Sequence, residues 1–280
     1  MAIKNPVFGR IDAEQKQGRF ATFRTGPSAA TQPVTVDDLE RQYAGPPATA
    51  ADTGRVTYDD VIMKTAAQFV LLLAGAAASW RYVSGLSVDH QSRGIAIWLA
   101  AMFVGLGIGL AISFRRTISV PLILTYAVVE GVFVGAASEY FNTAYPGVVG
   151  QAVIGTLAAF AGMLIAYKTG LIKVNDKFRR IMFFAITGYA CVALVSLVSA
   201  FLGVGGGFGF YGVGAFGVLL CAAGVVFAAA SLALNFDTID RMVTAGEPAK
   251  TAWLLGHGLL VTLVWLYIEL LRLLSVLRNN

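Results

Sequence analysis

Charged residues are scarce in this chain: Asp, Glu, Lys and Arg make up 13% of its 280 residues, whereas hydrophobic residues make up 57%. A soluble domain averages about 25% charged residues, so this composition excludes an ordinary soluble domain and predicts an integral membrane protein. The mean hydropathy of +0.70 agrees with that prediction. The formal net charge of +5 does not indicate a nucleic-acid partner, because no polar segment has a basic stripe with interleaved aromatic residues.

The sequence also has few residues of the kinds that hold metals or perform catalysis. Its two cysteines, Cys191 and Cys221, lie in apolar runs, which indicates packing rather than a disulfide or a metal pair. His90 and His257 are isolated from other ligand residues. Serine-hydrolase and zinc-protease motifs are missing, and segment 207–212 matches the dinucleotide fingerprint only by its letters, without a strand–turn–helix context. We therefore expect neither enzymatic activity nor a cofactor.

The first 57 residues differ from the rest of the chain. Residues 1–20 are polar and contain no apolar core of signal-peptide length, so the first membrane span is expected to act as an uncleaved signal. Residues 26–54 are rich in Pro, Gly, Ala and Thr without apolar periodicity, which is typical of disorder. We expect a disordered cytoplasmic tail over 1–57 and a membrane domain over 58–280, with a capped helix start at Thr57.

Seven apolar stretches are long enough to cross a bilayer, which takes about 20 predominantly apolar residues per helix. They are residues 62–82, 94–114, 118–138, 148–168, 181–203, 213–236 and 252–277. This pattern predicts an all-α integral membrane protein, a bundle of seven transmembrane helices. No internal repeat is apparent, so an inverted-repeat transporter is not indicated.

Lysine and arginine residues collect in alternate connections between these stretches. The connections after the second, fourth and sixth stretches contain Arg115, Arg116, Lys168, Lys173, Lys177, Arg179, Arg180, Arg241 and Lys250. The connection after the first stretch contains Arg81 and Arg93, and those after the third and fifth contain neither residue type. Because basic residues mark the cytoplasmic side, the N-terminus is predicted to be cytoplasmic and, with seven spans, the C-terminus to be outside.

Two acidic residues stand out in sequence that is predicted to be in the membrane: Asp237 at the end of the sixth stretch and Glu269 within the seventh. A charged residue at the bilayer centre costs about 2.5–3.5 kcal/mol on insertion scales, so such residues usually face a bundle interior and mark an ion or proton pathway. The simpler alternatives are a helix end at the water interface for Asp237, and an ion pair with Arg272 for Glu269. Asp240, one turn after Asp237, is expected to be solvated.

An approach of Asp237 to Glu269 would create a specific chemical site. Two carboxylates within a few ångströms of each other cannot both ionise cheaply, so they share a proton. In the deprotonated state they present hard oxygen ligands that suit Ca²⁺. A proton-sensitive calcium site is therefore a coherent hypothesis for these two residues.

Other residues of the spans have two interpretations each. Glu130, midway along the third stretch, is either a hydrogen-bonding anchor between helices or part of a pathway. Arg115 and Arg116 either only mark the cytoplasmic side or also reach an acid on another helix. Glycines at packing spacing in the second and third stretches indicate close helix contacts, with a flexible gate as the alternative; they are Gly105, Gly107, Gly109, Gly131 and Gly135.

Three motifs carry a resemblance to a known family: Ser-Phe-Arg-Arg at residues 113–116, Phe-Asp-Thr at 236–238 and Leu-Tyr-Ile-Glu-Leu-Leu at 266–271. With them the chain resembles the Bax inhibitor-1/YccA family of seven-span proteins, also called transmembrane Bax inhibitor motif proteins, from about residue 60 to residue 277. The Asn-Pro-Val-Phe start at residues 5–8 and the Pro-rich tail resemble those of actinobacterial members.

The resemblance implies a bundle whose last helix lies at the centre, surrounded by the other six, and a pH-sensitive calcium leak. In the family, an acidic pair on the last two helices acts as the proton sensor, and an arginine at the end of the second helix latches onto the sixth-helix acid. Carried over to this chain, the pair is Asp237 and Glu269, which are also the candidate Ca²⁺ ligands, and the latch is Arg115 or Arg116. The chain departs from the family pattern at Glu269, where the family has Asp.

The start of the last helix decides whether the pair can meet. Counted from the start of the seventh stretch, Glu269 lies about 26 Å along its helix, too deep to meet Asp237 easily. If the helix begins near Gly258, after an interfacial segment at 246–256, the depth is about 17 Å, close to mid-membrane. Extending the sixth helix to about Val243 would bring Asp237 inward. We therefore expect this second geometry.

These inferences predict a passive, proton-regulated leak for calcium or other cations in a bacterial inner membrane, with acid favouring the open state. Its expected partners are the lipid bilayer, calcium ions and protons, and Glu130, Asp240 and Arg272 would serve as pathway or packing residues. The alternative is a regulatory membrane protein whose N-terminal tail binds and restrains a membrane protease or stress factor.

Overall fold

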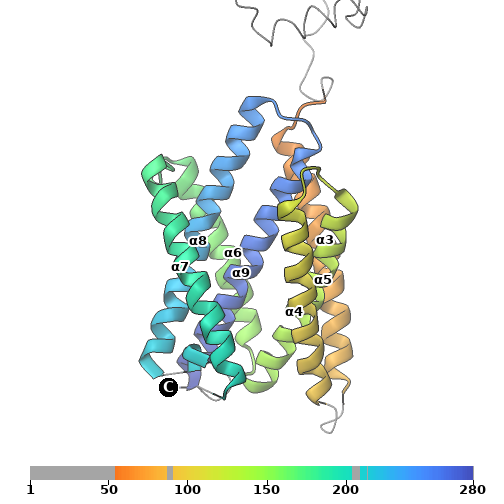
Figure 1. Cartoon of the computed structure of the whole chain (residues 1–280), viewed down its shortest axis with the longest axis vertical. Helices are drawn as coiled ribbons and strands as arrows, with labels where there is room; N and C mark the ends of the chain where they lie inside the picture. Colours follow the sequence, from red (N-terminus) through yellow and green to blue (C-terminus); the bar gives the residue numbers. More distant parts are fainter. Residues whose placement is uncertain (1–53, 87–90, 204–208, 213, 280) are drawn as a thin grey trace, which may run out of the picture. The chain divides into compact units, whose positions relative to one another are not determined.

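The computed structural model describes residues 54–86, 91–203, 209–212 and 214–279 (Figure 1). Most of the predicted disordered tail, His90 and the first part of the fingerprint-like segment lie outside these residues. What is described is the predicted membrane domain together with the four residues that precede it.

Seven long α-helices make up nearly all of this part of the chain. They are α3 (Tyr58–Ser84), α4 (Gln91–Phe114), α5 (Val120–Ala144), α6 (Val148–Lys168), α7 (Asp176–Phe201), α8 (Gly214–Ala245) and α9 (Thr251–Asn279), with a short 3-10 turn, η3 (Gly209–Gly212), before α8. All seven helices are long and apolar enough to cross a membrane. The predicted all-α, seven-helix membrane bundle is therefore confirmed.

The helices run alternately up and down, so their connections fall at two ends of the bundle (Figure 1). The end that holds the start of α3 also holds the α4–α5, α6–α7 and α8–α9 connections, and we name it the basic end. Its basic residues are Arg55, Lys64, Arg115, Arg116, Lys168, Lys173, Lys177, Arg179, Arg180, Arg241 and Lys250. The opposite end holds Arg81, Arg93 and Arg278. The two ends thus differ in basic charge, as a positive-inside arrangement requires.

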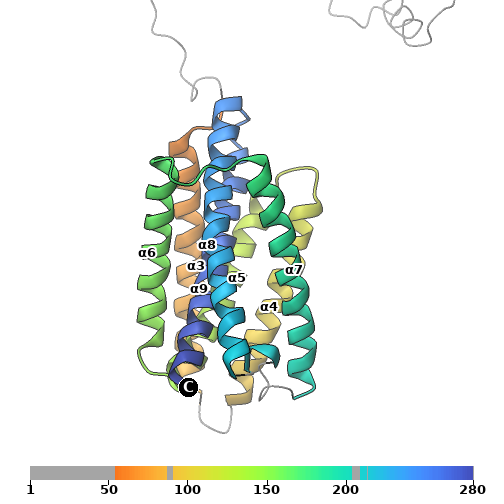
Figure 2. The same cartoon turned by 90° about the vertical axis from the view of Figure 1, so that its left-hand side faces the viewer.

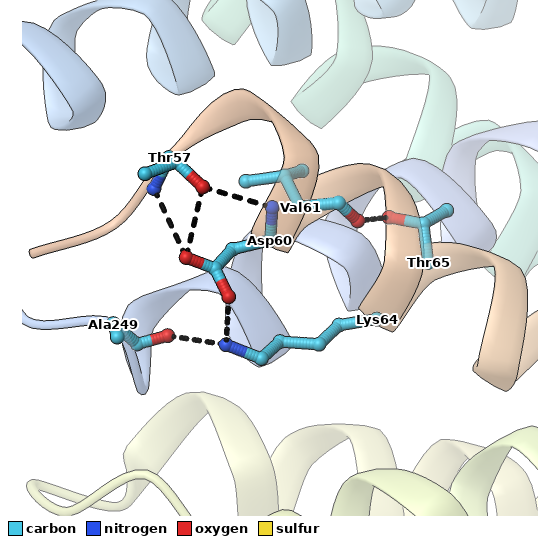
Figure 3. Close-up of polar contacts among 6 residues, drawn as sticks. All are labelled: Thr57, Asp60, Val61, Lys64, Thr65 and Ala249. Atoms are coloured by element: carbon cyan, nitrogen blue, oxygen red, sulfur yellow. Dashed lines mark hydrogen bonds and ion pairs between the residues drawn. The ribbon is translucent and has the colours of Figure 1, made fainter. Parts of the chain in front are cut away.

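The start of α3 has the capping box that the sequence predicts. Thr57 Oγ1 accepts a hydrogen bond from the Asp60 N–H at 3.0 Å, and the Thr57 N–H donates to Asp60 Oδ2 at 3.3 Å (Figure 3). These two bonds satisfy backbone donors that a helix start otherwise leaves unpaired. Lys64 Nζ bonds both Asp60 Oδ1 at 3.0 Å and the Ala249 carbonyl at 2.9 Å. The capped turn is therefore tied to the connection between α8 and α9.

The α8–α9 connection is a short turn that the chain before α3 holds in place. Gly246 adopts φ +70°, a conformation open to glycine, directly after the end of α8. The Val56 N–H donates to the Glu247 carbonyl at 2.7 Å, and the Ala249 N–H donates to the Gly54 carbonyl at 2.8 Å. The segment that leads into α3 thus clamps the turn that links α8 and α9.

The last two helices differ from the predicted geometry in one respect. α8 continues to Ala245, so its predicted extension past Asp237 is confirmed. α9 begins at Thr251, so the predicted interfacial segment at 246–256 and the predicted start near Gly258 are wrong. The reason is that a few residues suffice for the turn, and the apolar residues directly after it are already buried against neighbouring helices.

Close contact between α3 and α5 depends on glycine. A Cβ atom on Gly131 would lie 2.2 Å from the Leu72 carbonyl oxygen, and one on Gly135 would lie 2.2 Å from the Ala76 carbonyl oxygen. Neither distance is compatible with a side chain, so the packing interpretation of these two glycines is correct. Gly107 on α4 differs, because nothing lies within 4 Å of its Cβ position.

The last helix packs against four of the other six. α9 contacts α8, α3, α6 and α5, and 56% of its most apolar stretch is buried, the largest share among the seven helices. α4 packs on α5, and α7 packs on α8 and η3. α7 reaches α9 through the side chain of Tyr189. An arrangement in which all six helices surround α9 is therefore not confirmed.

Candidate functional site

Asp237 lies near the basic end on α8 and joins that helix to α7. Its Oδ2 atom is 2.5 Å from Arg179 Nη2 and 3.2 Å from Arg241 Nε, and its side chain is 14% exposed. Arg179 is in the first turn of α7, whose start is capped by Asn175 Oδ1 accepting from the Phe178 N–H at 2.8 Å. A largely buried carboxylate between two guanidinium groups makes charge-assisted contacts, which are stronger than hydrogen bonds between neutral groups.

The arginine that contacts Asp237 is not one of the two expected from the family resemblance. Arg115 and Arg116 lie in the α4–α5 connection, where both are exposed. Neither forms an ion pair with any of the described residues. The reason is structural, because α4 packs on α5 and not closely on α8. From the sequence, Arg179 was expected only to mark the cytoplasmic side. Its place two residues before the apolar stretch at 181–203 was the available signal.

Asp240 lies one turn beyond Asp237 and is exposed, in agreement with the predicted solvated position. It accepts a hydrogen bond from the Tyr58 hydroxyl at the start of α3. This bond links the end of α8 to α3, beside the turn that the chain before α3 clamps. Asp240 is thus a contact residue between helices at the basic end.

Glu269 is the more deeply buried of the two acids, with a side chain that is 3% exposed. Its Oε1 atom accepts from the Tyr189 hydroxyl at 2.8 Å and from Trp265 Nε1 at 3.2 Å, and both carboxyl oxygens are 3.3 Å from Arg272 Nη1. The predicted ion pair with Arg272 on the same helix is therefore present. The hydrogen bonds and the ion pair from Tyr189, Trp265 and Arg272 offset the free-energy cost of burying a carboxylate in an apolar bundle.

Two further residues complete the surroundings of Glu269. The Tyr211 hydroxyl in η3 donates to the Tyr189 hydroxyl at 3.0 Å, and the Tyr211 ring lies 4.3 Å from the Arg272 guanidinium carbon. Gly224 on α8 leaves the space, because a Cβ atom there would be 2.7 Å from the Glu269 carboxyl carbon. We name Glu269, Tyr189, Tyr211, Trp265 and Arg272 the glutamate cluster. Tyr189 and Tyr211 could not be identified from the sequence, because they lie on α7 and η3 and no motif or spacing relates them to α9.

The structure does not bring Asp237 and Glu269 together. Glu269 faces Gly224, thirteen positions before Asp237 on α8, which corresponds to about 20 Å along the helix. The level of Asp237 is occupied on α9 by the residues around Thr262, whose hydroxyl accepts from Asn235 Nδ2 at 2.7 Å. The expected shared proton and shared Ca²⁺ site are absent from this arrangement. The cause is the early start of α9, which carries Glu269 to the far half of the bundle.

Glu130 makes its contacts between α4 and α5. A Cβ atom on Gly105 would lie 3.1 Å from its Oε2 atom. Tyr126, one turn earlier, lies 3.4 Å from the Cβ position of Gly109 and packs edge-on against His257 of α9, with ring centroids 4.6 Å apart. Within the described ranges Glu130 forms no salt bridge. It therefore belongs to the helix contact and joins neither acid of the last two helices.

Metal-binding and nucleotide-binding features do not appear in the part of the chain that is described. No group of three or more His, Cys, Asp or Glu side chains there could hold a metal ion. Cys191 is exposed, Cys221 is buried, and both are free. Of the fingerprint-like segment, residues 209–212 form the 3-10 turn η3, which differs from the helix start that a dinucleotide site needs.

Comparison with known proteins gives one match. A family model described as Bax inhibitor 1 like matches residues 5–279, nearly the whole chain. A search of curated proteins returned no match.

Proposed function

The chain belongs to the Bax inhibitor-1-like family, and on that premise we propose that it forms a passive, pH-sensitive leak for calcium or other cations. The family is known as one of non-enzymatic membrane proteins. The observation that carries the proposal is that both acids of the last two helices are held by arginines, Asp237 by Arg179 and Glu269 by Arg272. In this proposal the bundle spans a bacterial inner membrane, with its basic end and its N-terminus in the cytoplasm.

The first gate of the proposed leak is the contact between Asp237 and Arg179. This ion pair joins α7 to its neighbour α8, and Arg241 adds a second guanidinium on the same carboxylate. Protonation of Asp237 would leave two neighbouring cations without their shared counter-charge. Loss of the ion pair removes the charged contact between the two helices, and the remaining guanidinium groups repel each other, so acid would loosen the start of α7 from α8.

The second gate is the glutamate cluster, about 20 Å further along α8. When Glu269 is charged, it accepts from Tyr189 of α7 and pairs with Arg272 of its own helix. Neutralisation would weaken both contacts and leave Arg272 without its counter-charge. In this proposal Asp237 and Glu269 are two separate gates at two depths of the membrane. They replace the single site expected from the sequence, in which one carboxylate pair shares a proton. Both gates join α7 to the helices behind it, which makes α7 the element that moves.

Calcium flux through liposomes tests this proposal. Full-length protein is reconstituted and flux is measured at about pH 6 and about pH 8, values on either side of neutrality. We expect wild-type flux to be higher in acid. Asp237→Asn and Arg179→Gln should both raise the flux at the higher pH towards the acid value, because each removes the ion pair between α7 and α8.

Matched substitutions at exposed positions of the basic end serve as controls. Glu247→Gln and Arg115→Gln change residues that take part in no ion pair within the described chain. Both should keep the wild-type flux and its pH dependence. Flux that stays unchanged in both Asp237→Asn and Glu269→Gln would refute the mechanism.

One observation favours a second function, that of a regulatory protein that restrains a membrane protease or stress factor. Residues 54–56 pair with the α8–α9 turn, so the chain that leads from the N-terminal tail contacts the end of the helix that carries Asp237. Deletion of residues 1–52 would preserve this pairing. If the deletion abolishes the cellular role and leaves liposome flux intact, binding by the tail is the main function. If Asp237→Asn abolishes the cellular role while the tail is intact, the leak is the main function.

A further inference from the structure

A long apolar groove runs between α3 and α6 on the outside of the bundle. It encloses about 1410 Å³. The two helices run alongside each other (Figure 2), but they do not pack closely in the described part of the chain, so their facing sides stay apart. Leu259, Leu263 and Tyr267 of α9 line it as well, together with residues of α5 and α8.

The groove has the length of a membrane. On α3 its lining runs from Tyr58 to Arg81, a rise of about 35 Å at 1.5 Å per residue. The hydrocarbon core of a bilayer is about 30 Å thick, so the two ends of the groove reach the headgroup layers on both sides. Between these ends the lining is almost entirely apolar, as a site for acyl chains must be.

The two ends of the groove differ in charge. At the basic end the lining contains both Lys168 and Asp240, with Asp240 bonded to Tyr58. At the opposite end Arg81 is the charged lining residue, and Trp80 lies beside it. Arg81 is exposed and has no ion-pair partner among the residues that are described. This end therefore presents an uncompensated guanidinium and an indole at headgroup depth.

We propose that the groove between α3 and α6 binds one glycerophospholipid with an anionic headgroup, from the leaflet at the Arg81 end. The phosphodiester pairs with the Arg81 guanidinium, whose planar donors match phosphate oxygens. An acyl chain lies along the apolar side of α3 at Leu73 and Ala77, facing Val153 of α6. Bound there, the lipid fills the space that keeps α3 and α6 apart.

The charge pattern favours a lipid over a helix from a second copy of this chain. A helix of another copy would need no cation at the mouth of the groove, whereas a phosphate next to an otherwise unpaired arginine is complementary to it. A basic residue near a membrane surface contributes about 1 kcal/mol to binding an anionic lipid, which corresponds to a factor of about five in affinity. Phosphatidylcholine has the same phosphodiester but also a cationic choline, whose charge offsets the attraction to Arg81, so Arg81 should favour a lipid whose headgroup is anionic overall.

Native mass spectrometry of the full-length protein in mild detergent tests the site, with phosphatidylglycerol and zwitterionic phosphatidylcholine as probes. We expect one retained phosphatidylglycerol per chain and weaker retention of phosphatidylcholine. Arg81→Gln should lower the phosphatidylglycerol affinity about fivefold. Arg93→Gln, which removes an exposed arginine from the same end outside the groove, should not change it.

A second pair of variants tests the apolar part. Ala77 lines the groove, whereas Ala78 is also exposed on α3 but is not among the lining residues. Ala77→Phe should reduce retention of both lipids, and Ala78→Phe should reduce neither, with thermal unfolding unchanged in both. Equal affinities for Arg81→Gln and Arg93→Gln, equal retention for Ala77→Phe and Ala78→Phe, or a dimer in place of the lipid-bound monomer would each overturn the proposal.

Discussion

Asp237 and Glu269 look alike in the sequence, yet their surroundings differ. Asp237 is paired across two helices with Arg179, near the end of the bundle. Glu269 takes most of its partners, Trp265 and Arg272, from its own helix and lies deeper. An acid in an apolar bundle persists only where donors and a counter-charge surround it. Each acid therefore forms a complete polar site by itself, and neither needs the other.

Within the glutamate cluster, the ion pair predicts a non-additive effect on stability. Arg272→Met leaves a carboxylate that is 3% exposed without its counter-charge, which should cost about 3–5 kcal/mol of unfolding free energy. Glu269→Gln should cost less, because glutamine keeps a polar side chain of the same length whose amide oxygen can still accept from Tyr189 and Trp265. The double variant should lose less than the sum of the two, since it removes both charges.

Denaturant unfolding of the purified protein in detergent, followed for the two single variants and the double variant, measures this coupling. Arg93→Met, at an exposed position, is the control and should change stability by no more than about 0.5 kcal/mol. If the two single losses simply add up in the double variant, Glu269 and Arg272 do not depend on each other.

At the scale of the elements, the register between α8 and α9 decides which residues meet. The turn at 246–250 sets that register, and two contacts report it: Asn235 with Thr262, and Gly224 with Glu269. Because α9 begins directly after this turn, the place of its start decides which of its residues face a given position of α8. The separation of the two acids therefore follows from the length of one connection.

The glycine contacts of α3 with α5 predict a loss of stability on the smallest substitution. Gly135→Ala would bring a methyl group to 2.2 Å from the Ala76 carbonyl oxygen, a backbone atom that cannot turn aside. Helix propensity alone would favour alanine by up to about 1 kcal/mol. Overpacking should outweigh this gain and leave a net loss of roughly 1–3 kcal/mol.

Gly107→Ala on α4 is the matched control, because its Cβ position has no neighbour within 4 Å. It should be neutral or slightly stabilising. Thermal unfolding of both variants in the same detergent compares them. A Gly135→Ala protein as stable as Gly107→Ala would show that α3 and α5 do not need this close approach.

For the whole molecule, the sequence predicted the seven spans and the capped start at Thr57, because apolar length and capping are local properties. The extension of α8 past Asp237 was also correct, although it was expected only as a way to bring Asp237 towards Glu269. The apolar stretch at 252–277 begins one residue from the start of α9 at Thr251, whereas the later start near Gly258, preferred because it would let the two acids meet, was wrong. The sequence also did not predict that Arg179 contacts Asp237. Which side chains face each other across a bundle depends on helix rotation and register, which only the packed structure fixes.

The distribution of basic residues over the whole bundle carries a final prediction, on orientation. The basic end holds the start of α3, and an odd number of spans puts the end of α9 on the other side. Since lysine and arginine in short loops stay cytoplasmic, the C-terminus should be outside. Alkaline phosphatase fused after Asn280 should be active, and a green fluorescent protein fused there should be dark. The same reporters inserted at Gly170, in the α6–α7 connection, should give the reverse. A bright fluorescent fusion at Asn280 would place the basic end outside, and with it the ion pair of Asp237 and Arg179 on the side away from cytoplasmic pH.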